Sequence, residues 1–351
     1  MSQPDTDIPL EWFDLAAQAH GGAVLWANDD FFAEKDNLLR PTEPVWDADA
    51  YTDRGKWMDG WETRRRRTPG HDKCHIRLGV AGRVRRVLVN TAFFRGNYPD
   101  ACSLEGCVAA PDATPEFLEN EATWHELVAQ SKLEGNSENW FEVDDHHRYT
   151  HLRFHIYPDG GVARLRVYGE PICDPDEIDR AGQVDLASML WGATTVRQSD
   201  MFFGRSQNLL KPSRGVNMGD GWETRRRRGP GHDWVVVRLA ADGLIERVEV
   251  DTNHFQGNYP DRCSMEICSE LPTQDPAEQC WPALFNERKL MAHSRHLVEI
   301  EEPQAARYAV LRIYPDGGVS RLRLWGRLTQ IGRQELGLTW LNALVPEQAE
   351  A

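Results

Sequence analysis

The stretch DGWETRRRR, from Asp59 to Arg67, decides the fold because it recurs without a change from Asp220 to Arg228. Self-similarity at a fixed offset is the signature of a duplicated domain. The match extends in both directions and covers the whole of each half. Further aligned segments are Gly70-His71-Asp72 with Gly231-His232-Asp233, GNYPD from Gly96 with GNYPD from Gly257, and YPDGGV from Tyr157 with YPDGGV from Tyr314. The chain is therefore one domain present in two copies.

The duplication sets the predicted domain boundaries. We expect the first copy at residues 1–175 and the second at residues 180–330, each long enough to bury its own core. The rest of the chain, 331–351, includes RQELGLTWLNALV (333–345), whose leucines have helical spacing. We expect this tail to form a short C-terminal helix that packs across the domains or against another subunit.

Each copy has the pattern of an all-β domain. Segments such as VRRVLVNTAF (84–93) and VARLRVYG (162–169) alternate apolar and polar residues, which is typical of half-buried strands. PDGG, which begins at Pro158 and Pro315, predicts a hairpin turn because glycine adopts positive φ values at no steric cost. The stretches after Trp124 and Trp281 are candidates for a short helix. No alternation of strands and helices is present, so two antiparallel β-sandwiches are expected.

Composition excludes several classes of protein. The chain is 40% hydrophobic, which is too apolar for disorder, yet no apolar run is long enough for a membrane helix. Its N-terminal residues lack the pattern of a signal peptide, so we expect a cytoplasmic protein. Seven cysteines at scattered spacings favour reduced thiols. The formal net charge of −15 argues against a nucleic acid or a membrane as partner.

Two runs of four arginines, Arg64–Arg67 and Arg225–Arg228, stand out against this acidic balance. Each run lies in a stretch that looks extended, so alternate side chains should point to opposite faces. Half of each run is expected to be solvated or paired with acids. The other half, with Arg64 and Arg66 on the same face as Glu62, is expected to face a ligand.

Four long strings, spread over both halves, carry a resemblance to a known family: DGWETRRRR, PGHDWVVVRL, VDTNHFQGNYPDRCSMEIC and YPDGGVSRLRLWG. In these strings the chain resembles the allantoicase family. The resemblance implies two tandem jelly-roll β-sandwiches of the galactose-binding-like kind, and it favours a homo-oligomer. It also implies hydrolysis of allantoate to ureidoglycolate and urea in purine (allantoin) degradation. Nothing in the sequence requires a nucleotide or flavin cofactor.

That reaction makes three demands on side chains. An arginine can hold the carboxylate of allantoate through two parallel hydrogen bonds. An acid must protonate the departing urea nitrogen while a base activates water. Polar groups must pair with the buried ureido groups. Candidates for the acid–base chemistry are His254, Asp251, Glu223, His232 and Asp233. Candidates for substrate binding are Arg225, Arg64, Glu62, His71, Asn258, Tyr259 and Asn97.

His254 is the most attractive single candidate because the copies differ there. The second copy reads Asp251-Thr252-Asn253-His254-Phe255, whereas the first reads Asn90-Thr91-Ala92-Phe93-Phe94. Only the histidine can exchange a proton near neutral pH. The chemistry is therefore expected to depend on the second copy.

Structural alternatives stand beside each candidate. GNYPD can be a simple turn, with Asn and Asp bonding their own backbone. The His-Asp pairs can be purely structural, and the strand glutamates can merely neutralise nearby arginines. Trp61 and Trp222 are expected in the cores. A tandem module that binds a small polar ligand or a sugar without chemistry is the alternative function for such a fold.

The sequence leaves a metal site undecided. His146, His147, His151 and His155 lie close together, but on a strand, residues four apart are about 13 Å from each other, too far to share one ion. The two CxxxxC pairs lack the spacing of a zinc site. A divalent metal held by His and carboxylates that the fold brings together is an open alternative.

Overall fold

The computed structural model describes residues 8–272, 276 and 279–349, and it divides the chain into two compact units. The first-repeat unit consists of Trp12–Ile172 and Asn342–Ala351. The second-repeat unit consists of Cys173–Leu341 and Met1–Glu11. Each unit thus holds one copy of the repeat together with a terminal segment from the far end of the chain.

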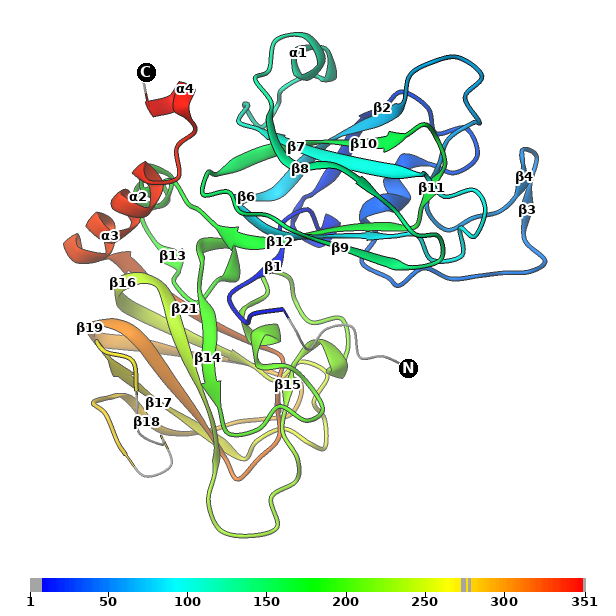
Figure 1. Cartoon of the computed structure of the whole chain (residues 1–351). Coiled ribbons are helices and arrows are strands. Elements are labelled where there is room, and N and C mark those ends of the chain that lie inside the picture. Colours follow the sequence, from blue (N-terminus) through cyan, green and yellow to red (C-terminus); the bar gives the residue numbers. More distant parts are fainter. Residues whose placement is uncertain (1–7, 273–275, 277–278, 350–351) are drawn as a thin grey trace. The chain divides into compact units, whose positions relative to one another are not determined.

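The first-repeat unit is an antiparallel sandwich organised around the long strand β6 (Asp72–Asn90). The first half of β6 pairs with β2 and β10, and its second half pairs with β9 and β12. One strand therefore contributes to both layers, which Figure 1 shows with β7 and β10 in one layer and β9 and β12 in the other. The remaining strands are β1 (Phe13–Asp14), β2 (Ala23–Ala27), β3 (Tyr51–Thr52), β4 (Gly55–Lys56), β5 (Trp61–Glu62), β7 (Ala101–Cys107), β8 (His125–Lys132), β9 (Glu138–Glu142), β10 (Tyr149–Tyr157), β11 (Gly161–Val162) and β12 (Arg164–Pro171).

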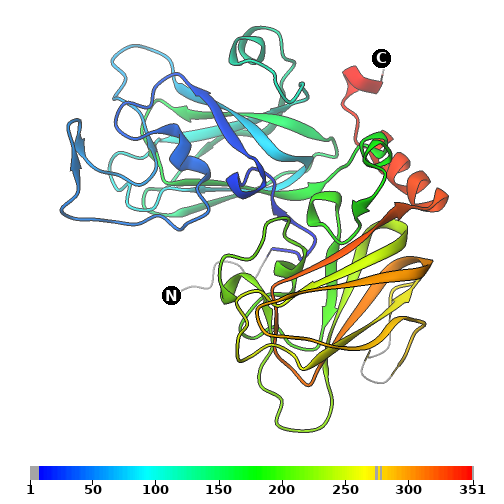
Figure 2. The ribbon, with the colours of Figure 1, turned by 180° about the vertical axis from the view of Figure 1, so that it is seen from behind.

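The second-repeat unit has the same plan around β16 (Asp233–Asp251). Its neighbour β19 (Arg295–Tyr314) is continuous where the first unit has the two strands β9 and β10. Figure 2 shows these strands from behind. The other strands are β13 (Val184–Asp185), β14 (Thr194–Gln198), β15 (Trp222–Glu223), β17 (Arg262–Cys268), β18 (Ala283–Lys289), β20 (Gly318–Val319) and β21 (Arg321–Leu328). The prediction of a duplicated, antiparallel all-β fold is confirmed.

Helices are short and peripheral. The α-helices are α1 (Pro115–Asn120), α2 (Pro175–Ala181), α3 (Gln330–Leu341) and α4 (Pro346–Ala349), and the 3₁₀ turns are η1 (Gln18–His20), η2 (Lys35–Leu39), η3 (Met189–Trp191), η4 (Ser206–Leu210) and η5 (Met218–Asp220). The predicted C-terminal helix is present as α3. The helices expected after Trp124 and Trp281 are not: strands β8 and β18 follow these tryptophans. No helix in the described part of the chain is both long and apolar enough to span a membrane.

The core explains why PDGG is retained in both copies. Trp61 and Trp222 are fully buried, as predicted. A side chain on Gly161 would place its Cβ 1.9 Å from the ring of the buried Phe94, and Gly318 meets Phe255 in the same way. The preceding glycine, Gly160, has φ +140°, which favours a residue without Cβ. The turn therefore closes tightly over an aromatic side chain, which fixes the loops beside it.

Candidate functional site

Each unit has a polar pocket where β5 or β15 meets the loop of the GNYPD segment. The pocket of the first-repeat unit has a volume of about 590 Å³, and that of the second-repeat unit about 520 Å³. We call them the paired pockets, because the same twelve residue types line both, position for position. In the first unit they are Phe32, Glu62, Thr63, Arg65, Arg66, Gly96, Asn97, Tyr98, Asp100, Pro158, Asp159 and Gly160. In the second they are Phe203, Glu223, Thr224, Arg226, Arg227, Gly257, Asn258, Tyr259, Asp261, Pro315, Asp316 and Gly317.

A carboxylate and an amide face each other in both pockets. Asn97 donates a hydrogen bond from Nδ2 to Oε1 of Glu62 at 2.7 Å, and Asn258 donates to Glu223 at 2.6 Å. Burial raises the pKa of the Glu62 carboxyl above its ordinary value, and the hydrogen bond from Asn97 opposes this shift. In each unit the structure thus brings together two residues that the sequence singled out separately.

The loop that carries Asn97 is held by the PDGG turn. The backbone N–H of Gly161 donates to the carbonyl of Asn97 at 2.7 Å, and Gly318 donates to Asn258 at the same distance. Thr63 accepts from the N–H of Gly160 at 3.1 Å and so connects the turn to the residue after Glu62. These contacts bring the repeated strings of the sequence to one place in each unit.

The arginine runs divide in a way that differs from the prediction. Beyond Glu62 the chain is not in a β-strand, so strict alternation does not hold. Arg64 donates to Asp29 at 2.9 Å, outside the pocket, and Arg66 donates to the buried Asp72 at 2.5 Å. Arg65 lines the pocket and makes no hydrogen bond or ion pair with any residue that the structure describes.

The second run repeats this division. Arg225 pairs with Asp200 at 3.5 Å, and Arg227 pairs with Asp233. Arg226 lines the pocket and, within the described residues, has no polar partner. Arg64 and Arg225, the arginines expected at the site, thus do not line the paired pockets, whereas Arg65 and Arg226, which were not among the candidates, do. Asp72, six residues after Arg66, is a nearby signal for the pairing of Arg66, whereas Asp29 is separated from Arg64 by 35 positions.

His71 and His232 lie outside the paired pockets. His71 Nε2 is 2.8 Å from His155 Nδ1, and His155 Nε2 is 2.8 Å from a carboxylate oxygen of Glu105. In the second unit Arg312 donates to His232 Nε2 at 2.8 Å. Burial lowers the pKa of both His71 and His232, and the neighbouring His155 and Arg312 lower them further.

Asp233 is buried and is the anchor for Arg227. It also accepts a hydrogen bond from Ser199 at 3.0 Å. Asp233 does not line the paired pocket, although its partner Arg227 does. Of the acid–base candidates, Glu223 therefore lines this pocket, and His232 and Asp233 do not.

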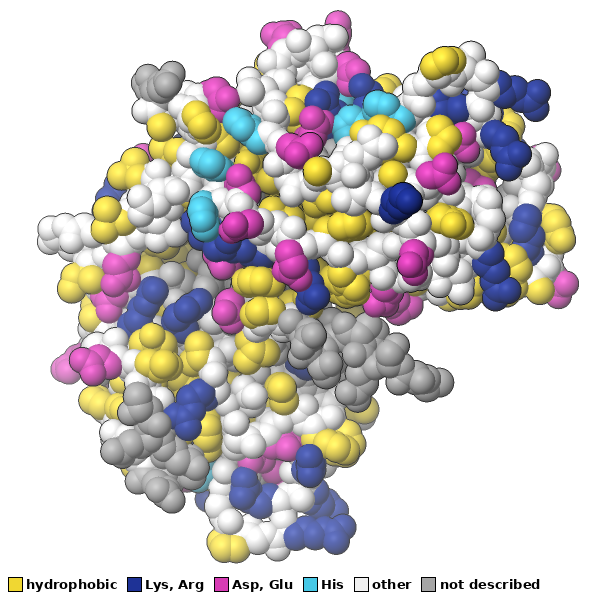
Figure 3. All heavy atoms as spheres, in the orientation of Figure 1, with side chains coloured by type: hydrophobic (Ala, Val, Ile, Leu, Met, Phe, Trp, Pro, Cys, Tyr) yellow, Lys and Arg dark blue, Asp and Glu magenta, His cyan; other side chains and the backbone are white. Residues whose placement is uncertain are grey.

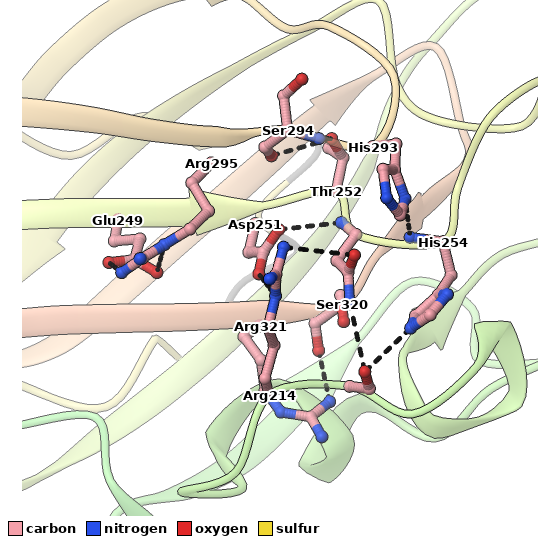
Figure 4. A network of polar contacts seen from close by, with 12 residues as sticks. Arg214, Glu249, Asp251, Thr252, His254, His293, Ser294, Arg295, Ser320 and Arg321 are labelled. Atoms are coloured by element: carbon pink, nitrogen blue, oxygen red, sulfur yellow. Dashed lines mark hydrogen bonds and ion pairs between the residues drawn. The ribbon is translucent and has the colours of Figure 1, made fainter.

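A different cavity, in the second-repeat unit, is lined by Asp251 but not by His254. We call it the single-copy pocket; its volume is about 520 Å³. Figure 4 shows the network of side chains around it. The lining residues are Gln183, Val184, Asp185, Ser188, Trp191, Pro212, Arg214, Glu249, Asp251, Arg295, Arg321, Arg323 and Trp325.

His254 lies at the edge of this network. Its Nε2 is 2.8 Å from the carbonyl oxygen of Gly215, so Nε2 carries the proton and donates it. Its backbone N–H donates to Nδ1 of His293 at 2.8 Å (Figure 4). The residue has φ +70°, and Phe93 in the first copy has φ +69°, so the two copies share this backbone conformation.

The described residues contain no group of three or more His, Cys, Asp or Glu that could hold a metal ion. All seven cysteines are free thiols, and burial raises the pKa of Cys102 and of Cys263 to about 12. On the face shown in Figure 3, Lys and Arg side chains form several separate groups with Asp and Glu among them. This face therefore presents no continuous basic surface.

Comparisons with known proteins place the chain among relatives over nearly its full length. The family model described as "Allantoicase repeat" matches residues 13–172 and 184–329. "Probable allantoicase 1" of Burkholderia mallei is 46% identical over 339 residues, which cover 93% of this chain and 98% of that protein. "Probable allantoicase" of Pseudomonas fluorescens is 45% identical, with 92% and 98% covered. The crystal structure of allantoicase from Saccharomyces cerevisiae is similar with a TM-score of 0.74 and 34% identity, covering 92% of this chain and 94% of that one.

The fold and the paired pockets define a class of protein: duplicated β-sandwiches that keep one polar pocket unchanged in both copies. The two matches to the repeat model fall on these two copies. The chain belongs to the allantoicase family. The prediction that it is an enzyme of this family, a hydrolase, is confirmed by relatives that match nearly the whole chain.

Proposed function

We propose that this protein hydrolyses allantoate to ureidoglycolate and urea in the paired pockets. One observation carries the proposal: all twelve lining positions have the same residue in both copies. Elsewhere the copies have diverged, as at Phe93 and His254. Folding accounts for part of this identity, since Thr63 and Gly160 hold the turn. It does not account for Arg65, which has no polar partner among the described residues.

The unpaired arginine suits the substrate carboxylate. Arg65 and Arg226 are exposed, lie at the pocket and are not neutralised by a neighbouring acid. A guanidinium can bind a carboxylate through two parallel hydrogen bonds, which fixes orientation as well as charge. Asn97 and Tyr98, on the loop opposite, can pair with the N–H and C=O groups of a ureido substituent.

Glu62 and Glu223 are suited to move the proton. As the oxygen of water bonds to the central carbon, the carboxylate takes one proton from that water. The C–N bond to one ureido group breaks, and the same carboxyl returns the proton to the departing nitrogen. The carbon keeps the hydroxyl and urea leaves. A carboxyl whose pKa is raised by burial, as that of Glu62 is, serves better as both base and acid near neutral pH.

The test is urea release from allantoate by the purified protein. We expect activity in the unaltered protein and at least a 100-fold loss in the double variant Glu62→Gln, Glu223→Gln, the usual scale for a positioned proton-transfer group. The matched control is Glu138→Gln with Glu301→Gln, which removes two exposed glutamates outside the pockets. Binding of allantoate without urea release by the unaltered protein would favour the alternative of a binding module. Full activity in the double variant would move the site elsewhere, with His254 and Asp251 next in line.

A further inference from the structure

The single-copy pocket owes its character to residues that the first copy lacks. Asp251 pairs in register with Arg295, and the corresponding pair in the first unit is Asn90 with Glu138. Glu249 corresponds in the same register to Leu88. At these positions the apolar Leu88 corresponds to the charged Glu249, and the neutral Asn90 corresponds to the acidic Asp251. The acidic Glu138 corresponds to the basic Arg295.

The lining arginines that both copies share have structural roles in both. Arg321 donates to Asp220 at 2.7 Å, as Arg164 donates to Asp59 at 2.7 Å in the first unit. Arg323 pairs with Asp185 at 3.4 Å, and Arg166 has the equivalent partner Asp14 at 3.8 Å. These ion pairs account for the arginines that both copies share, so no ligand is needed to explain them. They do not explain Glu249, Asp251, Arg295 or Arg214.

Of these four residues, Arg214 has the most unused hydrogen-bond donors. Its closest approach to Asp251 is 3.9 Å, and it donates one hydrogen bond of 3.4 Å to Asn253. Its side chain is 64% exposed. Arg295, by contrast, is held by two hydrogen bonds to Glu249 at 2.8 and 2.6 Å. A guanidinium has five N–H donors, so most donors of Arg214 are free for a ligand.

The segment that carries Arg214 is nevertheless fixed. The carbonyl of the next residue, Gly215, accepts from His254 at 2.8 Å and from Asn253 at 3.2 Å (Figure 4). A positioned arginine with unsatisfied donors, beside a buried carboxylate, is a pre-organised pair of opposite charges. Trp191 and Trp325 add apolar wall to the same cavity.

We infer that the single-copy pocket binds a small carboxylate that carries an N–H donor on the neighbouring carbon. Arg214 takes the carboxylate, and Asp251 accepts from the nitrogen. Both a ureido acid and an amino acid have this chemistry. The inference does not depend on the proposed function, because the ligand class follows from the charges of this cavity alone and none of its residues lines a paired pocket.

The experiment is calorimetric titration of the full chain in the background Arg65→Ala, Arg226→Ala, which removes the free cations of the paired pockets. The probes are N-carbamoylglycine, glycine and acetate. We expect one of the first two to bind with one site per chain, and acetate, which has no N–H donor, to bind at least tenfold more weakly. The stronger of the two probes identifies the nitrogen group that the pocket prefers.

Two variants and one control make the titration decisive. Arg214→Ala should weaken binding at least tenfold. The triple variant Glu249→Leu, Asp251→Asn, Arg295→Glu imitates the first copy, whose fold already accommodates these residues, and should abolish binding. Arg228→Ala, an exposed arginine of the same unit outside every described pocket, should leave it unchanged.

No binding of either nitrogen-containing probe, equal binding of acetate, or unchanged binding in Arg214→Ala would overturn the inference. The proposed function fails by a different result, the retention of urea release in the Glu62→Gln, Glu223→Gln variant.

Discussion

Neighbouring arginines of one run have different roles because their surroundings differ. Arg64 and Arg66 are neutralised by aspartates, and Arg65 between them is left without one. Sequence reasoning identified Glu62, Asn97 and their counterparts because these residues lie in repeated strings. It named Arg64 rather than Arg65 because the alternation of an extended chain was assumed where the strand already ends at Glu62. Partners distant in sequence, such as Asp29, decide the direction of each side chain.

The first prediction at this scale concerns the free arginines. Arg65→Lys combined with Arg226→Lys keeps the charge but loses the planar, two-pronged contact. We expect kcat/KM for urea release to fall by about 30-fold, equivalent to about 2 kcal/mol of transition-state binding. The control is Arg67→Lys with Arg228→Lys, which should change nothing. Equal kinetics in the two double variants would show that the paired pockets hold no carboxylate.

A second prediction uses the pKa of Glu62. With Glu223→Gln as background, only the first-repeat pocket is active. Replacing Asn97 by Leu removes the N–H donor that stabilises the ionised carboxylate, so the pKa of Glu62 should rise further. Activity requires the ionised form, which is lost as pH falls, and the acidic limb of the kcat profile should therefore move to higher pH. A limb that stays in place would mean that another group controls it.

At the scale of elements, the strands were predictable, whereas strands follow both Trp124 and Trp281, where helices were expected. Alternation identified β12 and the second half of β6, because each has one face in the core. The helix expected after Trp124 lies before it, as α1, where Thr114 caps the first turn and Pro115 occupies the first helical position. These two residues are a start signal for a helix, and HELVAQSK after Trp124 forms the half-buried strand β8.

The strand β6 begins with a buried ion pair whose loss should be costly. Asp72 is 1% exposed and accepts from Arg66 at 2.5 Å and from Asn28 at 2.8 Å. Asp72→Ala leaves a guanidinium without its counter-charge, and we expect the free energy of unfolding to fall by about 3 kcal/mol. Chemical denaturation measures this change. Asp53→Ala, at an exposed loop position, should shift it by less than about 0.5 kcal/mol.

His254 links the β16 end to the segment of Arg214, and His254→Phe tests that link. The first copy already accommodates Phe93 there, where its ring packs against Trp46 with centroids 6.0 Å apart. We expect the variant to fold, to release urea at the normal rate, and to bind the probe of the single-copy pocket about three- to tenfold more weakly, as for one lost hydrogen bond. A fall in turnover of about 100-fold would instead make His254 the acid or base.

For the whole molecule, the sequence predicted the duplication, but it predicted only some of the differences between the two copies. Phe93 and His254 were compared because they lie beside identical residues. The difference between Leu88 and Glu249 carries no such signal in the sequence, since both residues lie within strands where one face is buried and the other polar. Which face a strand residue occupies depends on register with its partners, and register is a property of the assembled sheet.

Two equal pockets predict additive activity. If each unit works alone, Glu62→Gln and Glu223→Gln should each retain about half of the turnover number with an unchanged KM. Steady-state kinetics of both single variants measure this. If one variant lost nearly all activity and the other kept its full activity, a single copy would catalyse the reaction.

The two units exchange the ends of the chain. Thr194 donates to the carbonyl of Leu10 at 2.9 Å within the second-repeat unit, and Arg148 donates to the carbonyl of Ala343 at 2.7 Å within the first-repeat unit. A gene split between codons 172 and 173 would therefore encode two polypeptides, each lacking a piece of its own fold that the other carries. Such halves should be complementary rather than autonomous, poorly folded when made singly and restored when made together.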